Sequence, residues 1–134
     1  VGFNARMTDI NAAIGRVQLS KLAGWTEQRI ANATRLSEGI TSVTTPPIAA
    51  GYTHVFHQYT IRSQDRDGLA TRLAERGIGS GVYYPIPNHL LPSLNRDLDL
   101  PETAKAAAEA LSLPVHPSLS EEDIETIIEG VNEG

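Results

Sequence analysis

Apolar positions recur at helical spacing over the first forty residues of the chain. Thr8 is placed to cap the first turn, and Asp9 follows where a carboxylate favours the helix dipole. Gly15 and Gly24 each weaken a helix interior by about 1 kcal/mol relative to alanine. The pattern therefore predicts one long helix, or two consecutive helices, over residues 8–38. Its apolar face consists of Ile10, Ile14, Val17, Leu19, Leu22, Ile30, Ala33, Leu36 and Ile40.

Shorter periodic segments follow a loop at 45–53, where paired prolines rule out a helix. Residues 54–62 alternate in polarity, which predicts a strand with one buried face. A short helix is predicted at about 67–76, ended by Gly77, and a second strand is predicted at 78–84. On the first predicted strand, one face is expected to carry Val55, His57, Tyr59 and Ile61.

The last third of the chain shows clear helix signals. Pro101 at a first helical position predicts a helix at 101–111, and a short extended piece follows at 111–115. Ser120 and Asp123 have the spacing of a capping box, which predicts the start of a final helix. The buried stripe of this helix is expected to be Ile124, Ile127, Ile128 and Val131.

These elements predict the α+β fold class, with two or three short strands covered by several helices. A chain of 134 residues fits a single domain that spans 1–134. We expect a leading segment and long helix at 1–45 and a small α+β domain at 46–134.

The composition argues against several classes of function. The net charge of −5 and the lack of a basic cluster argue against nucleic acid as a partner. The absence of cysteine excludes disulfides, thiolate metal sites and a cysteine nucleophile. No apolar run approaches the ~20 residues of a membrane span, and the N-terminus lacks signal-peptide character. Because the chain starts at Val1 without an initiator methionine, we expect a processed or excised piece.

The candidate polar sites are few. His54 and His57 would point to opposite faces of a strand, so no metal site is predicted. The glycines of 77–81 match no phosphate-binding motif and fit a helix stop before a strand. In the segment 81–89, GVYYPIPNH, two prolines restrict the backbone, and the segment ends with a polar Asn-His pair. From its residues alone, a binding loop and a proline-stiffened connection that covers the core are about equally favoured.

Two motifs point to one family. N-x-R-M at 4–7 precedes A-A-x-G-x-x-Q-L at 12–19, and Y-P-x-P-x-H occupies 84–89. With the segments between them, these motifs resemble the C-terminal part of the DegT/DnrJ/StrS nucleotide-sugar aminotransferases nearly end to end. The resemblance implies a cytoplasmic homodimeric enzyme that uses pyridoxal 5′-phosphate (PLP). It also implies the C-terminal domain of a fold-type I aminotransferase, with a small, mainly antiparallel sheet covered by helices and a long N-terminal helix.

The resemblance also implies roles for five residues. Asn4 matches the family asparagine that reaches the PLP phosphate of the neighbouring subunit, and its amide can donate to a phosphate oxygen. Arg6 matches the adjacent arginine, which suits a phosphate or carboxylate at the active-site rim. Tyr84 and His89 match the element near the sugar-nucleotide entrance, and His54 matches a frequent family histidine. We therefore expect Asn4 to bind the cofactor and the other four to bind substrate.

The catalytic lysine of the family has no match in this chain. Lys21 and Lys105 are its two lysines, and neither resembles the Schiff-base position. The resemblance thus implies a piece of an enzyme that transfers an amino group, typically from glutamate, to a nucleotide-linked keto-sugar, and that is inactive alone. Tyr83 stands where many members have histidine, so the keto-sugar stays open. Two alternatives also stay open: a sugar dehydratase of the same family, and a non-catalytic regulatory or binding module.

Overall fold

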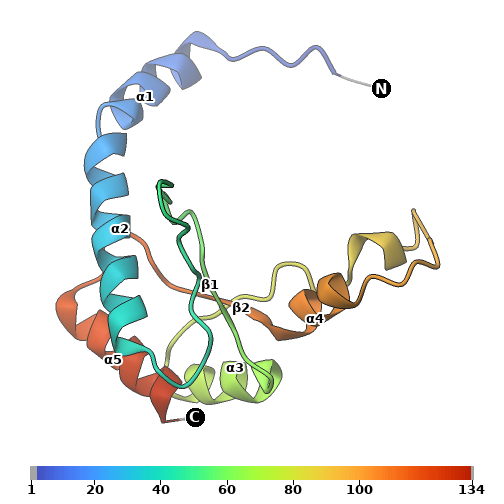
Figure 1. The fold of residues 1–134 in the computed structure, drawn as a ribbon. Helices are drawn as coiled ribbons and strands as arrows, with labels where there is room; N and C mark the ends of the chain where they lie inside the picture. Colours follow the sequence, from blue (N-terminus) through green and yellow to red (C-terminus); the bar gives the residue numbers. More distant parts are fainter. Residues whose placement is uncertain (1–2, 134) are drawn as a thin grey trace.

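The computed structural model describes residues 3–133, and it confirms the α+β fold class (Figure 1). Five α-helices and one 3₁₀-helix accompany a two-stranded sheet in this part of the chain. In chain order the elements are α1 (Asp9–Leu19), α2 (Leu22–Gly39), β1 (Tyr59–Arg62), α3 (Arg66–Glu75), η1 (Asn88–Leu90), α4 (Pro101–Glu109), β2 (Ala110–Leu113) and α5 (Glu121–Asn132). None of the described helices is long and apolar enough to cross a membrane.

The apolar pattern of residues 8–38 forms two consecutive helices. Thr8 caps α1 as predicted, since its Oγ1 accepts a hydrogen bond from the Asn11 backbone N–H at 3.3 Å. The break falls at Ser20 and Lys21, and both glycines of the segment lie inside helices. Ser20 Oγ donates to the Val17 carbonyl at 2.8 Å, so a local side-chain hydrogen bond competes with the helix at the break.

β1 and β2 pair in antiparallel fashion and present two different faces. The register joins Tyr59 to Leu113 and Ile61 to Leu111, and these four side chains are buried. Between them, Thr60 pairs with Ser112 on the opposite face, because successive strand residues alternate. The inner face therefore belongs to the core, and the outer face carries hydroxyl groups.

The predicted strand at 54–62 is wrong over residues 54–58, which precede β1. Phe56 has a φ of +45°, in the left-handed region, and this turn breaks the alternation. As a result Phe56 is 2% exposed and Val55 is 57% exposed, so Phe56 and not Val55 joins Tyr59 and Ile61 in the core. The Phe56 ring lies 6.1 Å from the ring of Tyr59, and burial of both rings offsets the backbone strain.

The second predicted strand, 78–84, is reduced to one bridge between Gly81 and Ser112. Two backbone hydrogen bonds of 2.9 Å form it, and the chain then turns away toward its prolines. Gly77 ends α3 as predicted: its φ of +75° is one that glycine adopts without cost.

The core lies between the inner face of the sheet and the helices α2, α3 and α5. α2 and α5 approach closely at Gly39, where an added Cβ would lie only 2.5 Å from Ile128 Cδ1. Burial raises the pKa of Tyr59, and its hydroxyl pairs with Ser37 Oγ at 2.9 Å. The core residues are Ala33, Leu36, Ile40, Phe56, Tyr59, Ile61, Leu69, Leu73, Ile78, Leu111, Leu113, Val115, Ile124, Ile127 and Val131.

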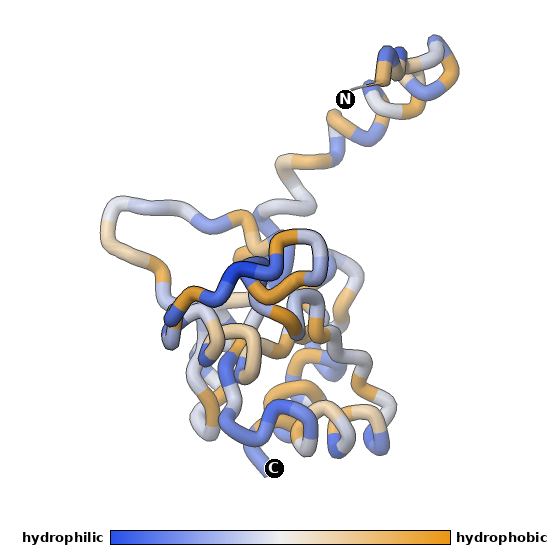
Figure 2. Tube along the Cα trace, turned by 90° about the vertical axis from the view of Figure 1, so that its right-hand side faces the viewer, coloured by the Kyte–Doolittle hydropathy of each residue, from blue (hydrophilic) through white to orange (hydrophobic). Residues whose placement is uncertain are grey.

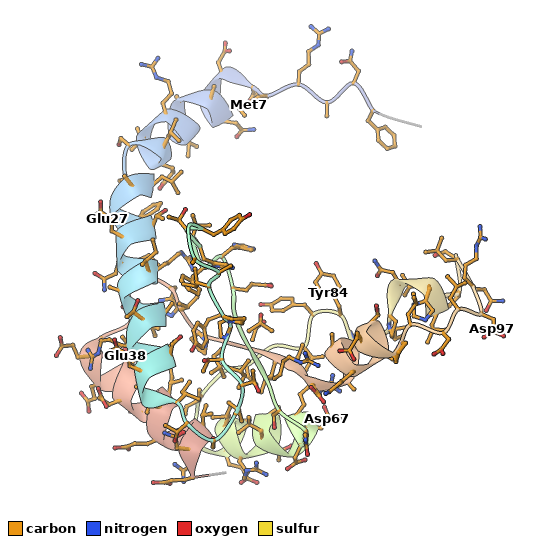
Figure 3. The ribbon with its side chains drawn as sticks, in the orientation of Figure 1. Met7, Glu27, Glu38, Asp67, Tyr84 and Asp97 are labelled. Carbon is orange, nitrogen blue, oxygen red and sulfur yellow. The ribbon has the colours of Figure 1, made fainter. Side chains whose placement is uncertain are left out.

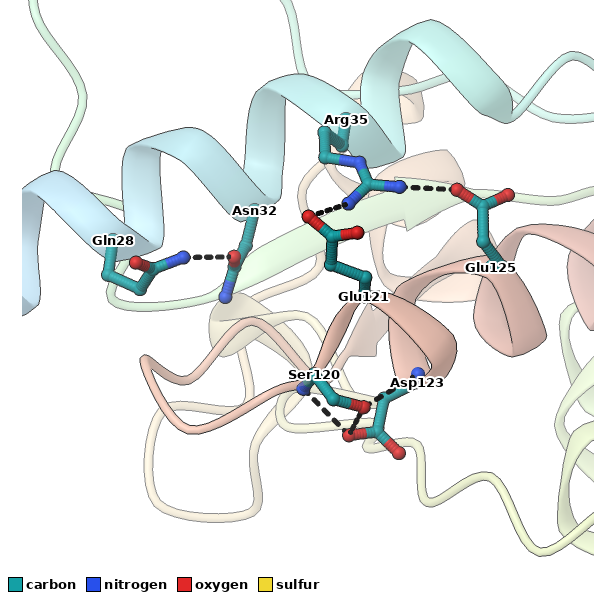
Figure 4. A network of polar contacts seen from close by, with 7 residues as sticks. All are labelled: Gln28, Asn32, Arg35, Ser120, Glu121, Asp123 and Glu125. Atoms are coloured by element: carbon teal, nitrogen blue, oxygen red, sulfur yellow. Dashed lines mark hydrogen bonds and ion pairs between the residues drawn. The ribbon is translucent and has the colours of Figure 1, made fainter.

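Polar contacts hold α5 against α2 (Figure 4). The predicted capping box is present: Ser120 N–H donates to Asp123 Oδ2 at 2.8 Å, and Asp123 N–H donates to Ser120 Oγ at 3.1 Å. Hydrogen bonds from Ser120 hold the pKa of the Asp123 carboxyl below its usual value. Arg35 of α2 forms ion pairs with Glu121 and Glu125 of α5, at the exposed edge of the contact between the two helices.

α1 contributes nothing to this core. None of its residues is buried, and it stands clear of the rest of the chain in two views (Figures 1 and 2). Its apolar positions are nonetheless those of a packing face. Ile10, Ile14, Val17 and Leu19 are all exposed.

Candidate functional site

Asn4 and Arg6 lie on an exposed N-terminal arm, residues 3–8, which has no regular secondary structure. The arm continues from the start of α1 past Met7 and projects away from the core (Figure 3). No hydrogen bond or ion pair to the Asn4 or Arg6 side chain occurs among residues 3–133. An amide and a guanidinium, both good donors to oxyanions, are thus left free on this arm.

His54 has a local structural contact. Its Nδ1 accepts a hydrogen bond from the Phe56 backbone N–H at 2.9 Å, and its ring lies 4.3 Å from the Phe56 ring. This two-residue bridge spans the left-handed turn at Phe56, which belongs to the core. The structure therefore gives His54 a role in shaping the bend before β1.

Replacing His54 with alanine should lower the free energy of unfolding by about 1 kcal/mol, the usual net contribution of one hydrogen bond. His54→Asn should retain most of the stability, because an asparagine oxygen accepts from the N–H two residues on. Urea unfolding followed by circular dichroism measures both variants. Equal stability of wild type and His54→Ala would show that the hydrogen bond does not hold the turn.

Tyr84 and His89 occupy the segment between Gly81 and α4. Tyr84 is exposed and lies on the concave side of the curve formed by α1 and α2 (Figure 3). His89 lies in η1 and is half-buried, and its carbonyl accepts a hydrogen bond from Arg96 N–H at 2.7 Å. Tyr84 lines a cavity of about 400 Å³, and His89 does not.

The cavity beside Tyr84 lies between the outer face of the sheet, residues 81–88 and α4. A second cavity, of about 340 Å³, adjoins it and is lined by Arg29, His57 and His116 among others. None of Asn4, Arg6, His54 and His89 lines either cavity. The structure thus separates the five predicted site residues: Asn4 and Arg6 lie on the arm, His54 at a turn, Tyr84 at a cavity wall and His89 in η1.

Several cavity residues were missed from the sequence. Thr60 and Ser112 are 52 positions apart and meet only through strand pairing, with their hydroxyl oxygens 2.8 Å apart. Ala106 and Ala110 read as ordinary helix formers. The bridge at Gly81 gives no sequence signal either, since it joins single residues. Among residues 3–133, no cluster of three or more histidine, aspartate or glutamate side chains could hold a metal ion.

The fold defines the class of protein. It is a small α+β domain with an apolar helix that does not pack on the core and with an exposed polar arm. The chain belongs to the DegT/DnrJ/EryC1/StrS aminotransferase family, whose model matches residues 1–132. This match confirms the resemblance of the N-x-R-M and Y-P-x-P-x-H motifs.

The similar proteins include enzymes and a regulator. A pleiotropic regulatory protein of Geobacillus stearothermophilus is 46% identical over 99% of this chain and 38% of its own length. A UDP-N-acetyl-3-dehydro-alpha-D-glucosamine 3-aminotransferase of Acidithiobacillus ferrooxidans is 36% identical over 95% of this chain and 36% of its own length. The crystal structure of DesV from S. venezuelae, in complex with a ketimine intermediate, superposes with a TM-score of 0.92. It is 32% identical, over 98% of this chain and 38% of the DesV chain. The chain thus spans well under half the length of these relatives.

Proposed function

We propose that this chain is the C-terminal part of a PLP-dependent aminotransferase that transfers an amino group from glutamate to a nucleotide-linked keto-sugar. The main support for this proposal is that Asn4 and Arg6 lie exposed on the N-terminal arm of a chain that belongs to an aminotransferase family. A named aminotransferase of a UDP-linked dehydro-sugar among the relatives supports the substrate class.

The arm fits the phosphate of PLP by its donor chemistry. Asn4 offers an uncharged amide donor, and Arg6 offers a planar set of N–H groups that suits phosphate or carboxylate. Neither side chain is engaged within the described part of the chain. PLP supplies a carbonyl carbon that accepts and releases an amino group. In the proposed homodimer, located in the cytoplasm, Asn4 holds the phosphate of the cofactor bound mainly by the neighbouring subunit.

Neither lysine of this chain suits the catalytic role. Lys21 lies at the start of α2, exposed, with its Nζ 5.9 Å from the centre of the Trp25 ring. Lys105 is exposed on α4. A lysine that attacks a carbonyl needs a desolvated amine, which neither position provides. The proposed catalytic lysine therefore belongs to the remaining part of a protein with the length of the relatives.

The exposed face of α1 supports the same proposal. Ile10, Ile14 and Val17 form an exposed stripe that no other part of residues 3–133 covers. Removing such a stripe from water is worth about 25 cal/mol per Å². In the proposed enzyme the remaining polypeptide packs on this stripe. This contact fixes the position of α1 and, with it, the position of the arm that precedes α1.

A second candidate function is a regulatory module with the family fold. The relative at 46% identity is named a pleiotropic regulatory protein, and that name favours this candidate. A sugar dehydratase of the same family is the third, and the residue that would distinguish it lies outside this chain.

The deciding experiment uses a protein with the relatives' length that contains this chain. It should bind PLP and convert glutamate and a nucleotide keto-sugar into 2-oxoglutarate and an amino sugar. The 134-residue chain alone should show neither turnover nor cofactor absorbance linked to lysine. Loss of water from the sugar without amino transfer would identify a dehydratase. No turnover at all across a panel of keto-sugars would favour the regulator, and a Lys21-dependent cofactor band would overturn the reasoning on the lysines.

A further inference from the structure

The loop of residues 45–58 projects from the start of β1 (Figure 1). Thr44, which precedes the loop, forms a bridge with Arg62, so the sheet holds both ends of the loop. Between residues 47 and 57, Phe56 is the one buried residue. The anchoring of the loop in the core therefore depends on Phe56.

The backbone of Phe56 adopts a conformation that needs support. Its φ of +45° lies in the left-handed region, which a bulky side chain rarely occupies. Two side chains hold this residue: His54 Nδ1 accepts from its N–H at 2.9 Å, and Arg29 Nη1 of α2 donates to its carbonyl at 3.4 Å. Within the loop, the one backbone–backbone hydrogen bond among the described residues runs from Tyr52 N–H to the Ala49 carbonyl. The turn at Phe56 is thus held by side chains and by burial of its ring.

The hydrogen bond from Phe56 requires a neutral His54. Because a backbone N–H can only donate, Nδ1 must present a lone pair, and the ring carries its proton on Nε2. A second proton goes to Nδ1 and makes it a donor that faces another donor. Histidine takes up this proton in the range from about pH 8 to about pH 5, so the hydrogen bond is coupled to the acidity of the solution.

The groups around the turn oppose a positive charge on His54. Arg29 already places a cation at the same turn. Together with His57 and His116, Arg29 also lines the cavity of about 340 Å³ beside α2, where Tyr83 is the other titratable residue. No aspartate or glutamate among the described residues lines this cavity. A proton on His54 therefore adds a cation to a region that already contains one.

His116 differs from His54 because it has a carboxylate nearby. Hydrogen bonds from Ser120 are the main cause that lowers the pKa of Asp123, and the charge of His116 contributes in smaller part. A proton on His116 is therefore balanced by Asp123. His54 forms no ion pair among residues 3–133.

We propose that His54 is a proton-sensitive latch, which holds loop 45–58 closed at neutral pH and releases it in acid. Above about pH 7 the imidazole is neutral whether the loop is closed or open, and the hydrogen bond contributes fully. As the pH falls through about 6.5, the open loop binds a proton more readily than the closed loop, so the equilibrium shifts to the open form. Release frees Phe56 and also moves His57 and Gln58, which line the cavity beside α2. Acid thus changes both the loop and one wall of this cavity.

Amide hydrogen exchange of the 134-residue chain, followed by NMR at about pH 7.5 and about pH 5, tests the latch. We expect the protection factor of the Phe56 amide to fall about tenfold in acid, the size expected for the loss of one hydrogen bond. The protection factor already corrects for the intrinsic pH dependence of exchange. The Ile78 amide, which donates to the Leu73 carbonyl at 2.9 Å, reports on the rest of the fold. Its protection factor should change less than about threefold.

His54→Asn is the matched variant for this measurement. Asparagine keeps an oxygen acceptor two residues before Phe56, but it takes up no proton in this pH range. The Phe56 amide of this variant should therefore stay protected at both pH values. His89→Asn makes the same change in η1, away from the turn, and should show the acid response of the wild type.

The ¹⁵N chemical shifts of the His54 ring give a second test that needs no variant. At about pH 7.5 they should show the proton on Nε2 and none on Nδ1. The latch is overturned by a proton on Nδ1 at this pH or by a Phe56 amide without protection. It is also overturned by equal acid losses in wild type and His54→Asn, or by parallel losses at Phe56 and Ile78. All of these groups belong to this chain, so the outcome is independent of the proposed amino transfer.

Discussion

Replacing Leu36 with alanine is expected to lower the free energy of unfolding of this chain by about 2–5 kcal/mol. Leu36 is 0% exposed and lies on the face of α2 that packs into the core. Its truncation leaves a cavity that the surrounding core residues fill only in part. Because small domains are stable by only about 5–15 kcal/mol, this is a large fraction of the total.

Ile14→Ala is the matched control, since Ile14 occupies the same predicted apolar stripe but is 56% exposed. Its stability in the isolated chain should stay within about 0.5 kcal/mol of wild type. Urea unfolding followed by far-UV circular dichroism compares the two variants. Equal losses would mean that α1 packs on the core in solution, and would contradict the arrangement in Figure 1.

This pair of residues shows what periodicity can and cannot predict. The spacing from Ile10 to Ile40 correctly placed helices over this segment, because helical spacing is a local property. It could not tell that the second half faces this core and the first half does not. That difference depends on tertiary packing, which local spacing does not encode. The break between the helices falls at Ser20 and Lys21 and not at a glycine, and Ser20 Oγ donates a hydrogen bond to the Val17 carbonyl there.

The segment before β1 shows a second limit. Alternation at 54–62 assumes a regular strand, and a single left-handed residue at Phe56 breaks it, so that Phe56 lies in the core together with Tyr59 and Ile61. Two buried rings and the His54 hydrogen bond outweigh the strand preference there. The capping box at Ser120 was predictable because its donors and acceptors are three residues apart.

The candidate site was predictable only in part. Tyr84 was found through a motif and does line a cavity. Thr60 and Ser112 belong to two different strands, and only long-range strand pairing brings them to one cavity wall. Asn4 was singled out through its motif, and its proposed role toward the PLP phosphate stays a prediction.

Asn4→Ala is expected to weaken PLP binding about 10- to 100-fold in a protein with the relatives' length that contains this chain. The change removes one hydrogen bond to a charged phosphate, which contributes about 1.5–3 kcal/mol. Stability of the isolated chain should not change, because Asn4 is exposed and has no hydrogen-bond partner among residues 3–133. Equilibrium dialysis against PLP gives the affinity, and thermal unfolding gives the stability.

Asn11→Ala is the control for this measurement. Asn11 is also an exposed asparagine near the N-terminus, and its backbone N–H alone takes part in the α1 cap. Its replacement should leave PLP affinity unchanged. Equal affinity of wild type and Asn4→Ala would remove the arm from the cofactor site, even if the protein transaminates. A selective loss in Asn4→Ala, with normal stability, would assign to this exposed arm the phosphate contact that its free amide makes possible.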